Sequence, residues 1–137
     1  TVPAGLGPSK RLLEMCRGYL RFARESPEHL VLLFTDLPGT APDWAAYRAA
    51  SPGFEWLVQA VRDGLETGEI EDAAGSGAVG VAFGVWGLVH GLSMLRATVL
   101  RGLTEDLGPA QEAAVAAHLA GLAPRGRPPV RFTGKGA

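Results

Sequence analysis

The sequence predicts an all-α protein, a single helical bundle of about five to six helices. Apolar residues recur three and four positions apart, and Pro and Gly separate the periodic segments at helix-length intervals. No stretch alternates apolar and polar residues as a strand would. With 137 residues, of which 47% are hydrophobic and 20% charged, the chain is long enough for one core and too apolar to be disordered.

Charge and cysteine content exclude several classes of protein. The chain has 13 basic and 14 acidic residues and a net charge of -1, so it has no field that would gather nucleic acid or anionic lipid. The lone Cys16 cannot form an intramolecular disulfide, which favours a reducing, cytoplasmic location. Because the first residue is Thr1 and not Met, we expect the chain to be a fragment or a trimmed product.

The first two helices are expected on either side of Pro27. From Lys10 to Glu25, apolar and charged residues occupy opposite faces of a helix that Ser9 is expected to cap. Pro27 ends this helix, because it disfavours the helical conformation of the residue before it. Ser26 and Pro27 then form the cap-and-proline start of a shorter helix that runs to Asp36.

A loop and two helical segments are expected in the middle of the chain. The stretch Leu37–Asp43 contains two prolines and a glycine, and we interpret it as a mobile loop. A short helical turn with Trp44 and Tyr47 follows. Ser51 and Pro52 then repeat the helix-start signal, and the apolar periodicity continues to a stop at Gly68.

The next segment, Ala73–Leu95, contains no Lys, Arg, Asp or Glu. Its length alone would allow it to cross a bilayer. It is rich in glycine, contains His90 and has no flanking aromatic belt. We therefore interpret it as the largely uncharged central helix of a soluble bundle, covered on both sides, and expect no membrane partner.

Gly108 and Pro109 introduce a last, alanine-rich helix that extends to about Leu122. The tail 124–137 combines basic residues with prolines and glycines and is predicted to be disordered. The expected organisation is therefore an N-terminal extension, 1–8, a helical domain, 9–123, and the tail.

Small residues form two matching stripes. Four glycines on the central helix are spaced four, three and four apart, and the last helix repeats the spacing. Each helical glycine costs about 0.5–1 kcal/mol relative to alanine, unless close packing of another backbone compensates. The two stripes suit packing within one chain or across the two-fold axis of a homodimer. The candidate interface residues are Gly80, Gly84, Gly87 and Gly91 with Ala110, Ala114, Ala117 and Gly121.

On another stripe of the central helix, Trp86 and His90 are neighbours one turn apart. For His90 three roles stay open: a hydrogen-bonded core imidazole, a ligand contact, or a catalytic or metal-binding group. No second His or carboxylate stands at metal-ligand spacing, and we predict neither a metal nor a cofactor.

The segment VWGLVHGLSML, Val85–Leu95, resembles the Trp-His-Gly signature of one large subgroup of TetR-family C-terminal domains. GYLRFARESPEHLVLLF, 18–34, and WLVQAVRDGLETGEI, 56–70, resemble other helices of that subgroup, and the likeness spans about residues 9 to 122. The resemblance implies a bacterial, homodimeric transcriptional repressor. In that family, an N-terminal helix-turn-helix head binds DNA and a C-terminal body binds a small-molecule effector. This chain lacks residues for the head before Ser9, so it is not itself expected to bind DNA.

The effector pocket is expected among aromatic and Met side chains, which favour a hydrophobic or aromatic small molecule. An ordinary core would use the same residues. Cys16 is interpreted as a small core residue, with a redox sensor as the alternative. The candidate ligand-binding residues are Met15, Tyr19, Phe22, Phe34, Trp56, Ala60, Phe83, Trp86, His90 and Met94.

The sequence also bears on two further function classes. An enzyme is not expected, because the sequence contains no Ser-His-Asp set, no paired carboxylates on one face and no phosphate-binding glycine loop. A helical dimerisation module without a ligand stays open as the alternative to a regulator body. A cavity beside Trp86 and His90 would distinguish the two.

Overall fold

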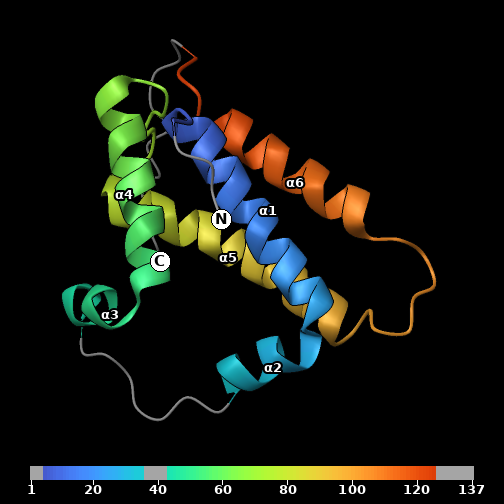
Figure 1. Ribbon diagram of the computed structural model, residues 1–137. Coiled ribbons are helices and arrows are strands. Elements are labelled where there is room, and N and C mark those ends of the chain that lie inside the picture. Colours follow the sequence, from blue (N-terminus) through green and yellow to red (C-terminus); the bar gives the residue numbers. More distant parts are fainter. Residues whose placement is uncertain (1–4, 36–42, 126–137) are drawn as a thin grey trace, which may run out of the picture.

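The computed structural model describes residues 5–35 and 43–125, which form six helices and no strand, as Figure 1 shows. The predicted all-α class is therefore confirmed. The predicted loop and tail lie outside the described residues, except for Asp43 and for Pro124 and Arg125. The helices are α1 (Pro8–Glu25), α2 (Pro27–Thr35), α3 (Trp44–Ala50), α4 (Pro52–Thr67), α5 (Gly77–Ala97) and α6 (Gly108–Gly121).

Two helices, α1 and α5, cross at the centre of the bundle (Figure 1). Each lies against α2, α4 and α6 as well as the other, whereas the α3 backbone lies close to α4 and reaches α5 through its aromatic side chains. The α6 helix lies beside α1 and runs antiparallel to it (Figure 1). The uncharged helix therefore has the predicted central position, but the prediction that it is covered on both sides is wrong, because only 28% of its most apolar 18-residue stretch is buried within the chain. By length and composition α5 could cross a membrane, but a single apolar helix is also what the core of a soluble bundle requires.

The core lies where α1, α4 and α5 meet. Leu12, Val58, Val61 and Val85 are almost completely buried there. Burial of each such side chain contributes about 1.5–3 kcal/mol to the hydrophobic free energy of folding. The other buried apolar residues of this cluster are Cys16, Leu20, Phe54, Leu57, Ala60, Ile70, Val81, Ala82, Val89 and Val115.

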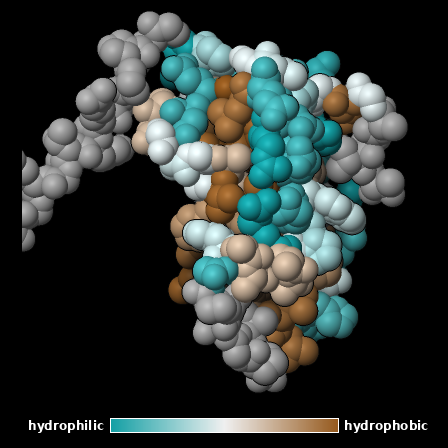
Figure 2. Space-filling model, turned by 90° about the vertical axis from the view of Figure 1, so that its left-hand side faces the viewer, coloured by the Kyte–Doolittle hydropathy of each residue, from teal (hydrophilic) through white to brown (hydrophobic). Residues whose placement is uncertain are grey.

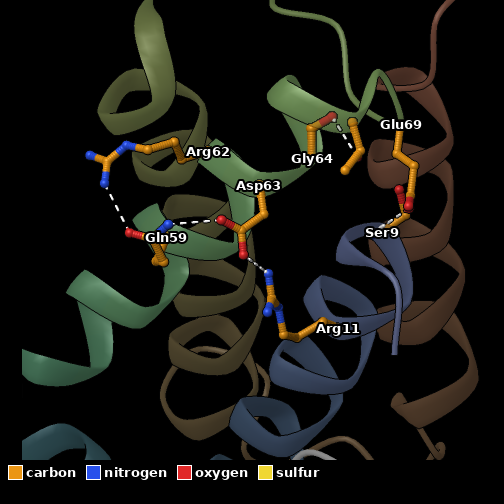
Figure 3. A network of polar contacts seen from close by, with 8 residues as sticks. Ser9, Arg11, Gln59, Arg62, Asp63, Gly64 and Glu69 are labelled. Atoms are coloured by element: carbon orange, nitrogen blue, oxygen red, sulfur yellow. Dashed lines mark hydrogen bonds and ion pairs between the residues drawn. The ribbon is translucent and has the colours of Figure 1, made fainter. Parts of the chain in front are cut away.

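The start of α1 differs from the prediction that Ser9 caps it. Gly7 is the N-cap residue and makes no side-chain cap, and Pro8 occupies the first turn. Pro8 has the backbone angle that a helix start needs and no N–H to satisfy, so the helix begins earlier. A residue from another part of the chain provides the cap, since Glu69 Oε2 accepts a hydrogen bond of 3.0 Å from the Ser9 amide (Figure 3). The ion pair between Arg11 and Asp63 joins α1 to α4 beside it (Figure 3).

The α4 helix has the predicted ends. Ser51 is its N-cap, Pro52 stands in its first turn, and Gly68 ends it in the left-handed conformation with φ of 76°. The α5 helix begins at Gly77, later than the uncharged run. Its start follows from Asp72, whose carboxylate accepts hydrogen bonds from the amides of Ser76 at 3.0 Å and Gly77 at 2.6 Å.

Candidate functional site

A cavity of about 530 Å³ lies between α1, α2, α3, α4 and α5. This volume falls in the range of small-molecule sites in proteins. One wall comes from α1, the opposite walls come from α4 and α5, and single residues of α2 and α3 complete it. The residues that line it are Glu14, Met15, Cys16, Gly18, Tyr19, Arg21, Phe22, Phe34, Tyr47, Ser51, Gly53, Phe54, Trp56, Leu57, Val85, Trp86 and Val89.

Aromatic rings from four helices meet around Trp86. The Tyr47 ring stacks on it with centroids 5.8 Å apart, and the Phe54 and Phe34 rings lie at 5.5 Å and 6.1 Å. Trp56 lines the cavity too, but 70% of it is exposed. Figure 2 shows the α3 and α4 side of the molecule, where hydrophobic residues form a stripe beside a hydrophilic band. The cavity is thus mainly apolar, with an aromatic wall that reaches the surface.

One polar pair stands in this wall. Tyr19 Oη and His90 Nδ1 are 2.9 Å apart and share a hydrogen bond, whose direction is set by the tautomer of the imidazole. The Phe34 ring lies 4.2 Å from the imidazole. Burial lowers the pKa of His90, because it disfavours the charged imidazolium. Burial also raises the pKa of Tyr19, although the Trp86 indole N–H opposes the shift. Both groups are therefore neutral near pH 7; Tyr19 belongs to the cavity lining, and His90 lies next to that lining without being part of it.

Cys16 lies in the cavity wall but is 97% buried by its neighbours, with 3% of its surface exposed. Burial raises the pKa of its thiol to about 11. Only the thiolate is strongly nucleophilic. At neutral pH the Cys16 side chain therefore acts as a small apolar group, as the core interpretation expects.

The cavity brings six of the ten candidate ligand-binding residues together: Met15, Tyr19, Phe22, Phe34, Trp56 and Trp86. The other four lie outside its lining. Ala60 is buried in the α4 core, and His90 lies behind Tyr19. Phe83 is half-exposed and packs against the Trp44 ring at 5.4 Å. Met94 lies two turns beyond Trp86, past the aromatic wall, because the stripe that carries it is longer than the cavity.

Sequence reasoning missed Tyr47, Phe54 and Gly18. The sequence places Tyr47 in a helical turn, but the positions of Tyr47 and Phe54 in the site depend on how α3 packs against α4. The bidentate ion pair between Arg48 and Glu55 fixes that arrangement, with Arg48 Nη2 and Glu55 Oε1 2.8 Å apart. Gly18 carried a usable signal, because a glycine inside the amphipathic first helix leaves a gap on the face between Met15 and Phe22. A Cβ added at Gly18 would meet no described atom within 4 Å outside its own stretch of helix.

The small-residue stripes face outward. Gly84 and Gly87 are exposed, as are Ala110, Ala117 and Gly121. A Cβ built at Gly84, Gly87, Gly91 or Gly121 would meet no described atom within 4 Å outside its own stretch of helix. The α5 and α6 stripes therefore do not pack closely on each other within one chain. Gly80 differs from these positions. A glycine is needed there for a local reason, because an added Cβ would stand 2.6 Å from the Cβ of Ser76.

Within the described residues, no group of three or more His, Cys, Asp or Glu side chains is placed to hold a metal ion. The described residues of the site can therefore bind a ligand through aromatic contacts and a few hydrogen bonds.

Comparison with known proteins gives one match. The family described as tetracyclin repressor-like, C-terminal domain, matches residues 12–122. No curated protein and no solved structure matches the chain. The Trp-His-Gly subgroup stays a prediction. The family match extends over most of the chain and over every helix described above, so the chain belongs to the tetracyclin repressor-like (TetR) C-terminal domain family.

Proposed function

We propose that this chain is the effector-binding and dimerisation domain of a TetR-type transcriptional repressor. The observation that carries the proposal is the aromatic cavity of about 530 Å³ between five helices. A ligand-free module has no need for such a space, because an unfilled apolar cavity in a bundle of this size lowers stability.

The effector is a hydrophobic or aromatic small molecule. Rings of Phe34, Phe54 and Trp86 offer apolar contact and ring stacking, and Tyr19 offers one hydroxyl that orients the ligand. The exposed Trp56 stands where a ligand would enter. Such a site combines a large apolar area with few polar groups, the usual composition of small-molecule pockets.

Repression would follow from a population shift. A helix-turn-helix domain outside this chain would bind the operator as a dimer, in the cytoplasm of a bacterium. An effector with a higher affinity for the non-binding arrangement of the two heads would weaken operator binding by that difference in affinity.

The dimer face is proposed to be the outward stripes of α5 and α6. Only 28% of the most apolar 18-residue stretch of α5 is buried within one chain. Gly84 and Gly87 let another backbone approach closely, and Ala110 and Ala117 of α6 present a similar surface. A second copy of the chain, packed through these residues, would form a four-helix bundle.

The proposed effector site is tested by a cavity-filling variant, Gly18→Leu. Leucine is a better helix former than glycine and has open space at this position, so the variant should fold at least as well as the wild type. A thermal-shift screen with uncharged aromatic compounds is the measurement. A ligand at about 100 times its Kd stabilises the wild type by about 2.7 kcal/mol. We expect the same compounds to have no effect on Gly18→Leu.

A matched control is Gly102→Leu, which makes the same change between α5 and α6, away from both the cavity and the proposed dimer face. It should keep the ligand response of the wild type. If no compound in a broad screen raises the Tm of the wild type, or if Gly18→Leu responds as the wild type does, the cavity is not an effector site. The ligand-free dimerisation module would then be the better interpretation.

A further inference from the structure

Arg21 distinguishes one end of the cavity from the rest. It lies on α1 two turns after Glu14, and both residues line the cavity. They are the one carboxylate and the one guanidinium among the described residues of the lining. The charge of a ligand that binds here therefore depends on whether the Glu14 carboxylate or the Arg21 guanidinium is free to pair with it.

The Glu14 carboxylate is already neutralised. Arg17 Nη1 donates to Glu14 Oε1 at 2.7 Å, one turn along the same face of α1. The second carboxylate near Arg17 is that of Glu112 on α6, at 3.7 Å. Arg17 and its two carboxylates therefore form a closed group that leaves no uncompensated positive charge on Arg17.

The Arg21 guanidinium has no such partner. Among the described residues, no carboxylate lies within ion-pair distance of it and no side-chain hydrogen bond engages it. It is exposed, so it keeps its hydration and its full charge at the rim of the cavity. Its planar fork of N–H groups matches the oxygens of a carboxylate or sulfonate.

We infer that the effector is an amphipathic anion, with an aromatic body inside the cavity and a single carboxylate or sulfonate group held at the rim by Arg21. The inference rests on the proposed effector site and names the ligand class that the site takes. The two parts of the ligand lie in different environments. Burying an ion in the interior around Phe34, Phe54 and Trp86 would cost a large free energy of desolvation, whereas at the rim the anion stays in contact with water.

An organic cation fits this distribution less well. Its natural partner would be Glu14, but the Arg17 guanidinium already occupies that carboxylate and would have to be displaced. Arg21 would also repel a cation at the same rim. The faces of the aromatic rings would attract a cation, but the Arg21 charge at the same rim opposes that attraction.

The experiment uses two fluorescent probes with the same anilinonaphthalene body. The anionic probe, 1-anilinonaphthalene-8-sulfonate, carries a sulfonate that the neutral probe, N-phenyl-1-naphthylamine, lacks. Titration of the 137-residue chain with each probe gives two dissociation constants. We expect the anionic probe to bind more tightly than the neutral one by about three- to fivefold, the ratio that an exposed ion pair provides.

The variant Arg21→Gln removes the charge and keeps a polar side chain. It should weaken the anionic probe by about three- to fivefold and leave the neutral probe within a factor of about two. The matched control is Arg24→Gln, because Arg24 is also an exposed arginine of α1 but lines a separate cavity of about 220 Å³. Added NaCl should weaken only the anionic probe, and only in proteins that keep Arg21.

The outcomes separate the two levels of the proposal. If both probes bind the wild type, neither binds Gly18→Leu, and Arg21→Gln affects the anionic probe alone, the inference holds. If both probes bind but the neutral one binds as tightly, or Arg21→Gln and Arg24→Gln behave alike, the anion inference is wrong while the effector site stands. If neither probe binds, or both bind Gly18→Leu as tightly as the wild type, the cavity takes no such ligand and both proposals fail.

Discussion

Among the glycines that the structure describes, Gly64 leaves the least room for an added Cβ. A Cβ there would stand 2.4 Å from Cδ1 of Ile70, which is 4% exposed and packs over α4. The Ile70 amide also donates to the Gly64 carbonyl at 3.0 Å. The turn after α4 therefore depends on the absence of a side chain at Gly64.

We predict that Gly64→Ala destabilises the fold, although alanine is the better helix former. Displacing Ile70 should cost about 1–3 kcal/mol, as overpacking of a core does. Urea unfolding followed by circular dichroism measures the change. Gly18→Ala is the control, since its Cβ meets open space and should leave stability unchanged or raise it by up to about 1 kcal/mol. Equal stability of Gly64→Ala and wild type would contradict the close approach of Ile70.

His90 gives the fold a dependence on pH. Burial lowers its pKa in the folded state, so the unfolded chain binds the proton more readily. The neutral form therefore contributes stability above the unfolded pKa of about 6.5, and this contribution is lost as pH falls from there through the folded pKa. In the imidazolium both ring nitrogens are donors, so after protonation His90 Nδ1 can only donate to the Tyr19 oxygen.

The free energy of unfolding of the wild type is expected to fall as the buffer is taken from about pH 7 to pH 5. His90→Gln should show a shallower fall over this interval. The control is His29→Gln, at an exposed position of α2, which should keep the wild-type slope. Urea titrations at each pH give the curves, and identical slopes for wild type and His90→Gln would show that His90 is not the group responsible.

At the scale of single residues, the sequence predicts side-chain chemistry better than side-chain partners. The periodicity of α1 and α5 places Tyr19 and Trp86 on inward faces, and the cavity includes both. The same stripe on α5 includes Phe83, which lies instead against Trp44. A helical repeat says which face a residue occupies, but the extent of the cavity along that face depends on where α3 and α4 begin and end.

At the scale of elements, helix ends depend on groups from outside the helix. Glu69 caps α1 from the loop after α4, and Asp72 caps α5 across a turn. Proline and glycine signals identify the end of α4 at Gly68 because they act through local backbone geometry. A cap that is donated from sixty residues away has no such local signal, which is why Ser9 was the wrong choice.

We predict that Asp72→Ala frays the start of α5. The Asp72 carboxylate accepts hydrogen bonds from the Ser76 and Gly77 amides and from the Ser76 hydroxyl. Burial works against the charged carboxylate, but these hydrogen bonds outweigh it and lower the pKa of Asp72. The loss should be about 0.5–2 kcal/mol, as for other cap residues.

The measurement is urea unfolding, with hydrogen exchange of the first α5 amides as a local probe. Glu71→Ala is the control for removing a charge at this turn, because no described group bonds to the Glu71 side chain. It should stay within about 0.5 kcal/mol of the wild type. Faster exchange in both variants, or in neither, would argue against the cap.

At the scale of the whole molecule, the arrangement of polar and apolar surface points to a second copy. The α5 helix is apolar on nearly every face, yet neighbours from the same chain cover only part of it. The sequence predicts the two small-residue stripes. The spacing of these residues is the same for packing within one chain and between two chains, so it cannot distinguish them. The outward positions of Gly84 and Gly87 favour packing between chains.

We predict that the chain sediments as a dimer at micromolar concentration and that Gly87→Glu shifts it to monomer. A carboxylate at the centre of a close helix contact would be desolvated without a partner. Gly53→Glu makes the same change in the first turn of α4, at an exposed position away from α5 and α6. It should sediment as the wild type does. A wild type that is monomeric, or a Gly87→Glu variant that stays dimeric, would remove the stripes from the interface.

The glycines of the cavity wall have a consequence for how this site can diverge. Gly18 and Gly53 both line the cavity, and neither would bring a Cβ within 4 Å of a described atom. One nucleotide change converts a glycine codon into an alanine or a valine codon. Selection can therefore narrow the binding site in small steps that leave the core packing intact, so related proteins with the same fold could come to respond to ligands of different size.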